Sequence, residues 1–402
     1  MRILAKLGVG VILAFLFACG NFLTGLQPAF TGTINVPTSK PTIQAGIDAA
    51  TSGDTVLVAP GTYYERINFY DKSITVKSSG GASGTIIDGS YNGSVVTFYE
   101  NTGRTTLDSF TIRNGSGTLN VEDGDTYGGG IYCFNSYPAI INNIIKSNSA
   151  DGGGGICCEG YDSFPNIYNN TILSNTGAGI YCKDGASPTV FNNIVVSNTA
   201  SSGGGGMFAD ESTTPDADDN DVWNNSAPQY GGDGWDFGIA GKNINADPRF
   251  VNAAVGDYHL KDTSPCINVG TGINYGAPNH DFEGETRPFN GKVDIGADEF
   301  VGTVSTTCSC EGESTGCISG LVTKKGVALK KKTVKLILKR TGSPKETFNT
   351  NTNTSGCYLF TGLPLVDGTY TIKVKGCKGG GSKVVPISGT TPAVDDVDFQ
   401  CR

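Results

Sequence analysis

The pattern of hydrophobic and polar positions repeats between Gly128 and Ser226, where short apolar stretches alternate with glycine and asparagine corners. One motif of two small residues, mostly glycine, followed by an apolar triplet occurs four times, with copies 25, 24 and 27 residues apart. The copies are Gly129-Gly130-Ile131-Tyr132-Cys133, Gly154-Gly155-Ile156-Cys157-Cys158, Ala178-Gly179-Ile180-Tyr181-Cys182 and Gly205-Gly206-Met207-Phe208-Ala209. Apolar residues do not recur at helical spacing over ten or more positions, so the repeat predicts short strands.

A unit of this length holds too few apolar residues to bury a core alone, and must stack on copies of itself. Strand alternation sends Ile131 and Cys133 to one face and Tyr132 to the other. Equivalent residues should therefore form columns along a solenoid. The expected inward columns are Ile131/Ile156/Ile180/Met207 and Cys133/Cys158/Cys182/Ala209. We expect the three cysteines of the second column to be reduced and buried. Alternation points Cys157 outward, which makes it the exposed thiol if one exists.

Each copy is followed by a proline and then by a pair of amides or their equivalent. The pairs are Asn142-Asn143, Asn169-Asn170, Asn192-Asn193 and Asp219-Asn220. Asparagine side chains readily bond nearby backbone groups, so stacked pairs predict an amide ladder that closes turns. Direct contact with a ligand is the alternative. Between these corners, Ile140 to Ile145 is expected to be strand-like.

These residues resemble the right-handed parallel β-helix repeat proteins of the pectin-lyase-like group. The stretch Gly53 to Glu65 closely resembles the amino-terminal coil of secreted members. Earlier, residues 41–50 predict one short amphipathic helix, with Ile43 and Ile47 on one side, lying across the first coil as a cap. Strands are expected at Thr33–Val36, Ser73–Lys77, Thr85–Asp88, Val95–Tyr99 and Thr106–Arg113. Together with the repeats they give seven or eight coils between Thr55 and Asn225. The acidic loop Val121–Thr126 interrupts these coils.

The first residues are typical of an export signal, since Lys6 precedes an apolar run from Leu7 to Phe17. Leu16-Phe17-Ala18-Cys19 resembles a bacterial lipobox, which makes Cys19 the lipidation candidate, although Phe17 departs from the usual residue. Ordinary cleavage nearby is the alternative. We therefore expect an extracellular or cell-surface bacterial protein, with an outer-membrane lipid anchor as the lipidated form.

After Ser226 the periodicity fades. Residues 247–300 resemble the carboxy-terminal region of bacterial surface β-helix proteins, where it finishes the solenoid. His259 is interpreted as a residue of this cap, with a catalytic base as the alternative. The expected organisation is a signal segment (1–30), a parallel β-helix with terminal caps (31–300), a linker (301–316) and a small antiparallel β-sandwich (317–402). The last part resembles carboxypeptidase-regulatory-like, prealbumin-like modules. The chain is thus expected to be all-β apart from its short capping helix.

Six cysteines crowd the carboxy-terminal region, and in an exported module of this size they most simply form three disulfides. They are Cys308, Cys310, Cys317, Cys357, Cys377 and Cys401. Their connectivity does not follow from the sequence. A metal site at Cys308 and Cys310 is the alternative, but the paired Cys-x-x-Cys spacing of zinc sites is absent.

Charge is divided unevenly between the two parts of the chain. Residues 304–402 hold 14 Lys and Arg against 7 Asp and Glu, leaving 15 against 31 for residues 1–303. The carboxy-terminal lysines are interpreted as solubilising, with an anionic polymer surface as the alternative. Nucleic acid is not expected as a partner, because no set of base-stacking aromatic residues accompanies the lysines.

Many proteins of the resembled group are polysaccharide lyases or glycoside hydrolases with clustered carboxylates, calcium and a base. The Asn-Thr-Asp, Asp-Asp, His-Gly and Arg-Ile-Lys motifs of pectin hydrolases do not occur here in order, and no catalytic residue is assigned. Stacking does predict a column of acids at Glu159, Asp184, Asp210 and Glu211. We interpret it as a solvated turn ladder with Lys183 as counter-charge; the alternative is a cation site, with calcium at Asp210 and Glu211.

Two function classes follow. The first is a non-catalytic surface module that contacts polysaccharide or cell-envelope glycan, or serves as a structural rod. The second is a carbohydrate-active enzyme with an acidic, calcium-binding groove. The first is favoured because catalytic motifs are missing, and because a fold by itself specifies no chemistry. No cofactor is assigned.

Overall fold

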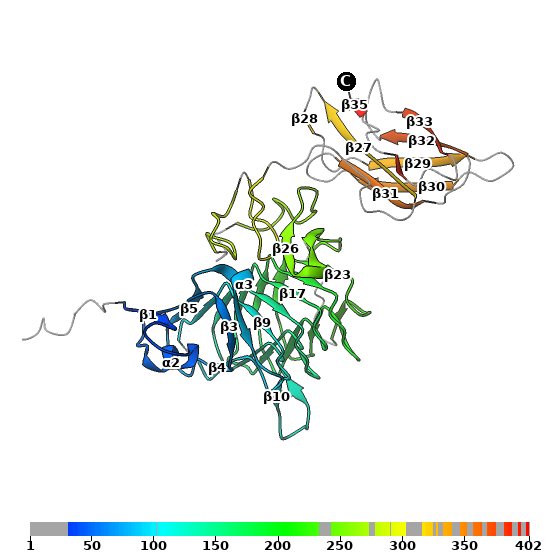
Figure 1. Ribbon diagram of the computed structural model, residues 1–402. Helices are drawn as coiled ribbons and strands as arrows, with labels where there is room; N and C mark the ends of the chain where they lie inside the picture. The colour runs from blue at the N-terminus through cyan, green and yellow to red at the C-terminus, as the bar shows by residue number, and fades with distance from the viewer. Residues whose placement is uncertain are drawn as a thin grey trace, which may run out of the picture.

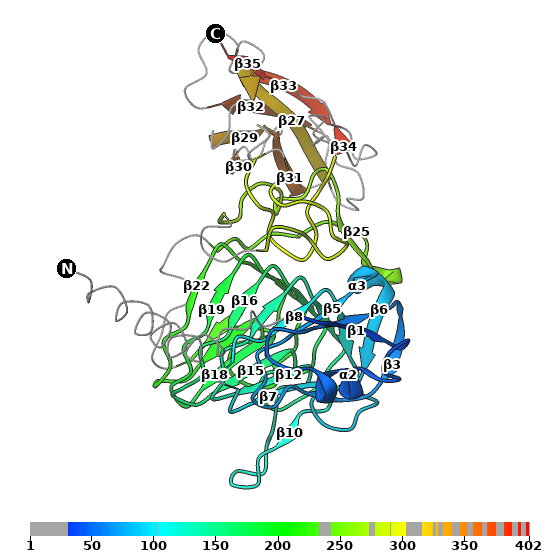
Figure 2. The ribbon, with the colours of Figure 1, turned by 90° about the vertical axis from the view of Figure 1, so that its left-hand side faces the viewer.

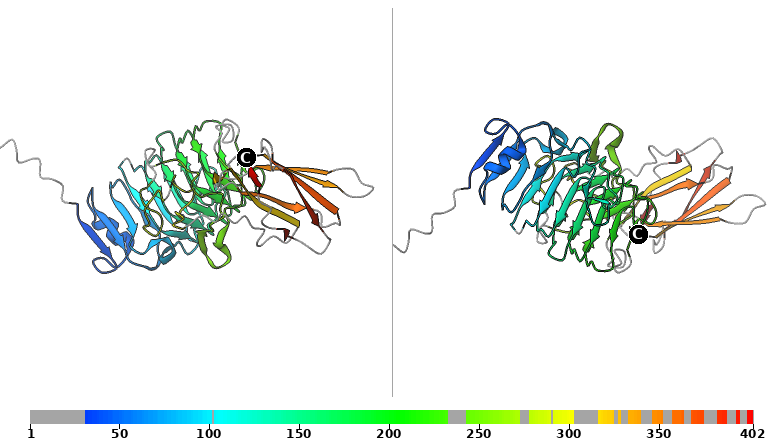
Figure 3. Two further views of the ribbon diagram at one scale, coloured as in Figure 1. Left: turned by 90° about the horizontal axis from the view of Figure 1, so that it is seen from above. Right: turned by 90° about the horizontal axis from the view of Figure 1, so that it is seen from below.

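The computed structural model describes residues 31–101, 103–232, 243–272, 278–289 and 291–302, together with the strands between residues 316 and 401. From residue 33 to residue 231, strands of successive coils pair in parallel and build three sheets. The chain therefore forms a parallel β-solenoid whose coils lie side by side (Figures 1 and 3).

The longest sheet has eight strands, which confirms the predicted number of coils. Sheet A contains β1 (Thr33–Val36), β2 (Thr55–Val58), β5 (Thr75–Ser78), β8 (Thr106–Asp108), β13 (Ala139–Ile141), β16 (Asn166–Tyr168), β19 (Thr189–Phe191) and β22 (Asp216–Asp218). Sheet B contains β3 (Gly61–Tyr64), β6 (Thr85–Asp88), β9 (Thr111–Arg113), β14 (Ile144–Lys146), β17 (Thr171–Leu173), β20 (Ile194–Val196) and β23 (Asp221–Trp223). Sheet C contains β4 (Ile67–Asn68), β7 (Val96–Tyr99), β12 (Ile131–Phe134), β15 (Ile156–Glu159), β18 (Ile180–Lys183), β21 (Met207–Ala209) and β24 (Tyr230–Gly231).

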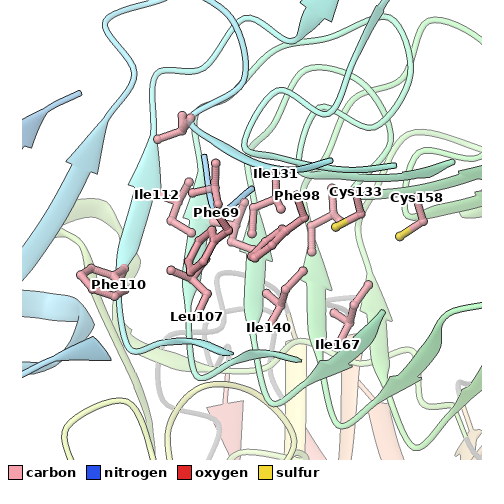
Figure 4. Packing of buried hydrophobic residues seen from close by; sticks show 14 of the residues in the cluster. Phe69, Phe98, Leu107, Phe110, Ile112, Ile131, Cys133, Ile140, Cys158 and Ile167 are labelled. Atoms are coloured by element: carbon pink, nitrogen blue, oxygen red, sulfur yellow. The ribbon is translucent and has the colours of Figure 1, made fainter. Parts of the chain in front are cut away.

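The core runs along the inside of the three sheets, as the repeat predicted. Ile131 pairs with Ile156, and Cys133 with Cys158, in the register expected from the sequence. The same columns continue through β18 and β21. Their side chains are fully buried with apolar residues of sheets A and B (Figure 4). The column cysteines are free thiols packed as small apolar groups, which confirms that prediction.

The corners of the coils are formed by residues with positive φ and by two ladders of asparagine. Asn142 and Ser147 have φ of 57° and 56°, so the expected strand from Ile140 to Ile145 is wrong and breaks into β13 and β14. Ser109, at φ 64°, likewise divides the stretch Thr106–Arg113 into β8 and β9. Short polar side chains tolerate this left-handed conformation best, which favours such residues at corners.

One of the two asparagine ladders confirms the predicted amide stack, for the second residue of each pair, while the first residue of each pair forms the corner with positive φ. The side-chain oxygen of Asn193 accepts hydrogen bonds from the backbone N–H and the amide of Asn170, at 2.9 and 3.0 Å. The same pattern joins Asn143, Asn170, Asn193, Asn220 and Asn243 in one ladder, and Asn148, Asn175, Asn198 and Asn225 in the other. Each rung satisfies polar groups that the stacked coils remove from water.

The glycine pairs of the repeat lie where the backbones of neighbouring coils approach each other closely. A Cβ on Gly130 would lie 2.7 Å from the carbonyl oxygen of Gly155, and one on Gly155 would lie 2.3 Å from that of Gly179. Backbone atoms cannot move aside as a flexible side chain can. Only glycine fits at these two positions without separating the coils.

The amino-terminal end of the solenoid is covered by helix α2 (Ile43–Ala49), as predicted. Ile43 and Ile47 are fully buried against the first coil. The hydroxyl of Thr42 accepts a hydrogen bond from the N–H of Ala45 at 3.1 Å. Lys72 donates from the other end to the carbonyls of Ile47, Asp48 and Ala50. Both ends of this short helix are thus capped.

The segment after the repeats departs from the expected cap. Asn243 and Ile244 continue the last coil, because Asn220 N–H donates to the Asn243 side chain and Val222 N–H to the Ile244 carbonyl. The described residues between 247 and 302 then run along one side of the solenoid (Figure 2) and pack on the outer face of sheet B. They include β25 (Phe250–Asn252), the 3₁₀ helix η1 (Ala253–Val255) and β26 (Asp257–Leu260). We call residues 247–302 the flank segment.

The flank segment buries an apolar outer face. Ile144, Leu173 and Ile194 point away from the core of the solenoid and pack against Ile267 and Ile295. Strands buried on both faces carry continuous apolar runs instead of alternation. The run Ile194-Val195-Val196 in β20 has that character. Helix α3 (Gly81–Gly84) meets the same layer, since the carbonyl of Phe282 accepts a hydrogen bond from Ala82.

Two further elements complete the described chain. The acidic loop forms a hairpin of β10 (Thr118–Leu119) and β11 (Thr126–Tyr127) that projects from the solenoid (Figures 1 and 2). The carboxy-terminal strands are β27 (Gly316–Lys324), β28 (Val327–Ala328), β29 (Thr333–Lys339), β30 (Glu346–Asn351), β31 (Cys357–Leu363), β32 (Gly368–Val374), β33 (Ser382–Ile387), β34 (Ala393–Val394) and β35 (Phe399–Cys401). None of the helices in the described residues is long and apolar enough to cross a membrane.

Candidate functional site

The outer face of sheet C carries a group of aromatic and charged side chains that the repeat points away from the core. Alternation places two columns there. The middle column contains Tyr132, Cys157, Tyr181 and Phe208. The second column lies at the carboxyl ends of the strands and contains Tyr99, Phe134, Glu159 and Lys183.

Aromatic rings stack from coil to coil at and beyond the strand ends. Tyr99 and Phe134 have ring centroids 4.8 Å apart, at an interplanar angle of 18°. In the turn that follows, Tyr137 and Phe164 stack with centroids 5.6 Å apart. Tyr99 is 48% exposed and Phe164 is 42% exposed. We call Tyr99, Phe134, Tyr137 and Phe164 the aromatic band; such exposed apolar surface is typical of a contact site.

Lys183 occupies the centre of a ring of carboxylates next to the aromatic band. Its ammonium lies 3.3 Å from Asp184, 3.6 Å from Asp123 and 3.8 Å from Glu159. It also lies 4.0 Å from the centroid of the Tyr127 ring, in a cation–π contact. Burial lowers the pKa of Lys183, but the neighbouring carboxylates outweigh it and raise the pKa above its usual value. The lysine is therefore charged and already neutralised by its partners.

Glu159 is held between Tyr132 and Lys183. The Tyr132 hydroxyl donates to Glu159 Oε2 at 2.9 Å, and the Glu159 side chain is 9% exposed. Burial raises the pKa of Glu159, while the Tyr132 hydrogen bond and Lys183 act in the opposite direction. A carboxyl group in this setting keeps its proton to higher pH than one in water.

The hairpin β10–β11 forms one edge of this face. Tyr127 in β11 donates from its hydroxyl to Asp123 Oδ2 at 2.8 Å. Its ring lies 6.1 Å from that of Tyr181. Asp123, in the turn of the hairpin, thus reaches Lys183 in β18, which lies two strands further along sheet C than β12.

The hairpin corrects the prediction for Cys157. The side chain does point away from the core, in the column of Tyr132, but it is fully buried. Tyr127 and Tyr132 cover it in a small apolar cluster, with Phe134 and Tyr181 beside it. The expectation that Cys157 is exposed is therefore wrong. Alternation specifies only the direction of a side chain, and the hairpin adds a second layer of protein on that side.

The predicted acids do not form an unbroken column. Glu159 pairs in register with Lys183, so opposite charges alternate along the strand ends. Asp184 follows Lys183 in the turn, and its N–H donates to Asp210 Oδ2 at 2.8 Å. Glu211 lies in the exposed turn after Asp210. Among the described residues, no group of three or more His, Cys, Asp or Glu side chains is placed to hold a metal ion, and calcium at Asp210 and Glu211 stays a prediction.

Both histidines lie in the flank segment, away from this face. His259 contacts Asp257 at 2.6 Å and Glu283 at 3.0 Å. His280 contacts Asp108 at 2.8 Å, which ties the segment to β8. The partners of His259 are half-exposed carboxylates of the flank segment, and the partner of His280 is the buried carboxylate of Asp108.

Sequence analysis did not identify the aromatic band or the carboxylate ring around Lys183. A signal was present, since Tyr99 and Phe134 end equivalent strands, and Tyr137 and Phe164 each precede the proline of their coil. The remaining predicted sites fall outside the described residues. These are the lipidation candidate Cys19 and the side chains of Cys308, Cys310, Cys317, Cys357, Cys377 and Cys401.

Comparison with known proteins agrees with the fold. Residues 74–243 match the family model described as right handed beta helix region. The match covers the coils from β5 to the last rung of the first asparagine ladder. No curated protein matches the chain.

Proposed function

We propose that this right-handed β-helix protein is a non-catalytic module that binds carbohydrate through the aromatic band on sheet C. The observation that carries the proposal is the in-register stack of Tyr99 on Phe134, with Tyr99 48% exposed. A sugar ring has an apolar face of C–H groups, which packs well on an exposed aromatic ring. Rigid aromatic side chains also lose little conformational entropy on binding.

The spacing of the solenoid supports an extended glycan as the ligand. Neighbouring parallel strands lie about 4.8 Å apart, so equivalent side chains recur at that interval along the axis. A sugar unit in an extended chain has nearly the same length. A polysaccharide that lies parallel to the solenoid axis therefore presents about one ring to each coil of the aromatic band.

The surroundings of Glu159 favour binding over catalysis. A general acid must reach the bond that it protonates. The Glu159 side chain is 9% exposed, its Oε2 accepts from Tyr132, and its Oε1 lies 3.8 Å from Lys183. These contacts give the carboxyl group a structural role in closing the second layer over sheet C.

A carbohydrate-active enzyme is the second candidate, and one observation favours it. Burial raises the pKa of Glu159, as a proton donor near neutral pH requires, and Asp184 and Asp123 lie around the same lysine. An opening of the β10–β11 hairpin would expose this group to a bound glycan.

Glycan-array binding and product release test the two candidates together. We expect binding of an extended glycan without release of reducing ends or unsaturated products, with or without calcium. Phe134→Ala should weaken binding about tenfold or more, because it removes the stacking surface. Phe191→Ala is the matched control, since Phe191 stacks on Tyr168 in the same way on sheet A.

If the protein releases products and Glu159→Gln abolishes this turnover, the second candidate, a carbohydrate-active enzyme, is correct. Equal loss of binding in the Phe134 and Phe191 variants would show that the aromatic band is not the contact surface.

The export and carboxy-terminal predictions are part of the same proposal. We propose that the protein is anchored to the outer membrane through lipidated Cys19, and that residues 317–402 form a carboxypeptidase-regulatory-like β-sandwich. Metabolic labelling with a fatty acid should mark the protein and not its Cys19→Ser variant. Release of unlabelled protein from wild-type cells would favour ordinary signal cleavage.

A further inference from the structure

We infer that the glycan site includes a further binding residue, Tyr161, and that the site holds a straight chain over at least four sugar units. This inference rests on the proposed function, because it names the length and the shape of the ligand for the same face. Its basis is the place of Tyr161 relative to the aromatic band and to the next coil.

The turn after β15 is two residues longer than the turn after β12. Phe134 in β12 pairs with Glu159 in β15, and Tyr137 in the first turn stacks on Phe164 in the second. Two residues separate Phe134 from Tyr137, whereas four separate Glu159 from Phe164. The inserted residues, 161–162, therefore lie between the strand-end part and the turn part of the aromatic band.

The Tyr161 side chain is exposed to solvent but held in position. It is 74% exposed, and its ring lies on Gly185 in the turn after β18, where a Cβ would overlap the ring. On the other side of the insertion, the N–H of Asp162 donates to Asn135 Oδ1 at 3.4 Å. Contacts with both neighbouring coils thus fix the ring, so it loses little conformational entropy when a ligand binds.

Tyr161 supplies the coil of β18 with the aromatic ring that this coil lacks at the positions of the aromatic band. The strand of this coil ends at Lys183, and its turn has Ser187 where the preceding turn has Phe164. Rings then lie on four successive coils, with Tyr99 on that of β7, Phe134 and Tyr137 on that of β12, Phe164 on that of β15 and Tyr161 on that of β18.

Four coils define the length of the bound chain. Neighbouring coils are about 4.8 Å apart, so three intervals span about 14 Å. With about one sugar ring for each coil, the site holds four units. The coils stack along one axis (Figure 3), so a chain that follows the rings must be straight. A β-1,4-linked glucose chain is extended in this way, whereas an α-1,4-linked glucose chain curls away from the line of rings.

Oligomers of glucose test the length and the shape of the ligand separately. β-1,4-linked oligomers of two, four and six units differ in length alone, and the α-1,4-linked hexamer differs from the β-1,4-linked hexamer in linkage alone. None of them carries a charge, so exposed side chains of either sign on this face, such as Arg104 and Asp162, do not decide the outcome.

NMR titration of the full chain measures these affinities, because it detects weak binding as well as tight binding. We expect the β-linked tetramer to bind at least about tenfold more tightly than the dimer, since two further coils contribute rings. The hexamer should bind within about threefold of the tetramer, because the rings end at the coil of β18. The α-linked hexamer should bind at least about tenfold more weakly than the β-linked one.

Two variants locate the further binding residue. Tyr161→Ala should lower the affinity for the tetramer about fivefold or more and leave that for the dimer nearly unchanged, because the dimer stacks on Tyr99 and Phe134. Tyr64→Ala is the matched control, since Tyr64 is 73% exposed but lies in β3 on sheet B. Gly185→Ala should also weaken the tetramer and spare the dimer, because its Cβ displaces the Tyr161 ring.

The other outcomes separate this inference from the proposed function. An unchanged tetramer affinity in Tyr161→Ala, or an equal loss in Tyr64→Ala, overturns the inference and leaves the proposed function in place. Equal affinities for the dimer and the tetramer, or for the two hexamers, do the same. If no glucose oligomer binds while the glycan array shows another ligand, the inference is likewise overturned, and absence of binding across the array overturns the proposed function as well.

Discussion

Arg287 and Glu299 form a fully buried ion pair, with Arg287 Nη1 3.0 Å from Glu299 Oε2 and neither side chain exposed. Arg287 Nη2 donates to the carbonyls of Gly296 and Ala297, at 2.9 and 2.6 Å. Glu299 in turn accepts from the N–H of Phe289. One planar guanidinium thus organises the end of the flank segment, which lacks regular structure of its own there.

Removing one partner of this pair should detach the flank segment. Arg287→Leu leaves the Glu299 carboxylate buried without its partner, which typically costs about 3–5 kcal/mol. Hydrogen exchange should then show loss of protection in residues 247–302 before residues 131–223. Arg249→Leu, in the same segment but partly exposed, should have a much smaller effect. Unchanged protection in Arg287→Leu would mean that apolar packing on sheet B is sufficient.

The flank segment should also show a pH dependence through His259. Burial lowers the pKa of His259, but its hydrogen bonds to Glu283 and Asp257 dominate and raise the pKa to about 9 from 6.5. A raised folded-state pKa stabilises the fold below pH 6.5 and loses that contribution as pH rises through about 9. His259→Gln should therefore lower the Tm at pH 6 and leave it nearly unchanged at pH 10. Equal effects at both values would exclude the charged contact as the cause.

Substitutions in the capping helix α2 should lower stability strongly at buried positions and little at exposed ones. Ile47 is fully buried, whereas Ala49 in the same helix is exposed. Even Ile47→Ala should cost about 2–5 kcal/mol, and Ile47→Asp should abolish soluble expression by opening the end of the core. Ala49→Asp introduces the same charge as a control and should change stability by less than about 1 kcal/mol. A soluble Ile47→Asp protein with a normal melt would contradict the cap.

Thiol labelling should distinguish the buried cysteines from the surface. Burial raises the pKa of Cys157 well above its usual value, so its reactive thiolate is scarce as well as covered. We expect Cys133, Cys157, Cys158, Cys182 and Cys266 to react only after unfolding, as followed by mass spectrometry of the labelled peptides. Fast labelling of Cys157 alone in the native protein would mean that the β10–β11 hairpin opens.

The carboxy-terminal module should unfold on reduction while the solenoid does not. Loss of one native disulfide costs about 2–5 kcal/mol, comparable with the stability of a module of this size. The five cysteines described in the solenoid and flank segment are free, so reductant leaves that part unchanged. Limited proteolysis with and without reductant should degrade residues 317–402 only after reduction. Survival of that fragment would strengthen the metal-site interpretation of Cys308 and Cys310.

The local sequence pattern was sufficient to predict the coils. The four copies around Ile131, Ile156, Ile180 and Met207 predicted the register that the sheets have, and the paired asparagines predicted one of the two ladders. Period-two alternation decides which side chains face the core, and a repeat period decides which ones stack. Both are written in neighbouring residues, so no knowledge of distant contacts is needed.

Local pattern was insufficient wherever a second layer covers the solenoid. Alternation correctly predicted that the Cys157 side chain points outward, but the packing of Tyr127 from the hairpin is what buries it. The apolar outer face of sheet B was visible in Ile194-Val195-Val196, yet nothing in that run specifies what covers it.

The sequence by itself determined the solenoid, its coil number, its inward columns and its helical cap. The tertiary structure alone decided which outward faces are covered and which remain available to a ligand. Asn169 bonds the carbonyl of Asp294 across 125 residues, and Asp123 reaches Lys183 from the hairpin. Such contacts depend on the path of the chain between them. Their free energy comes from pairs far apart in sequence, which no local pattern encodes.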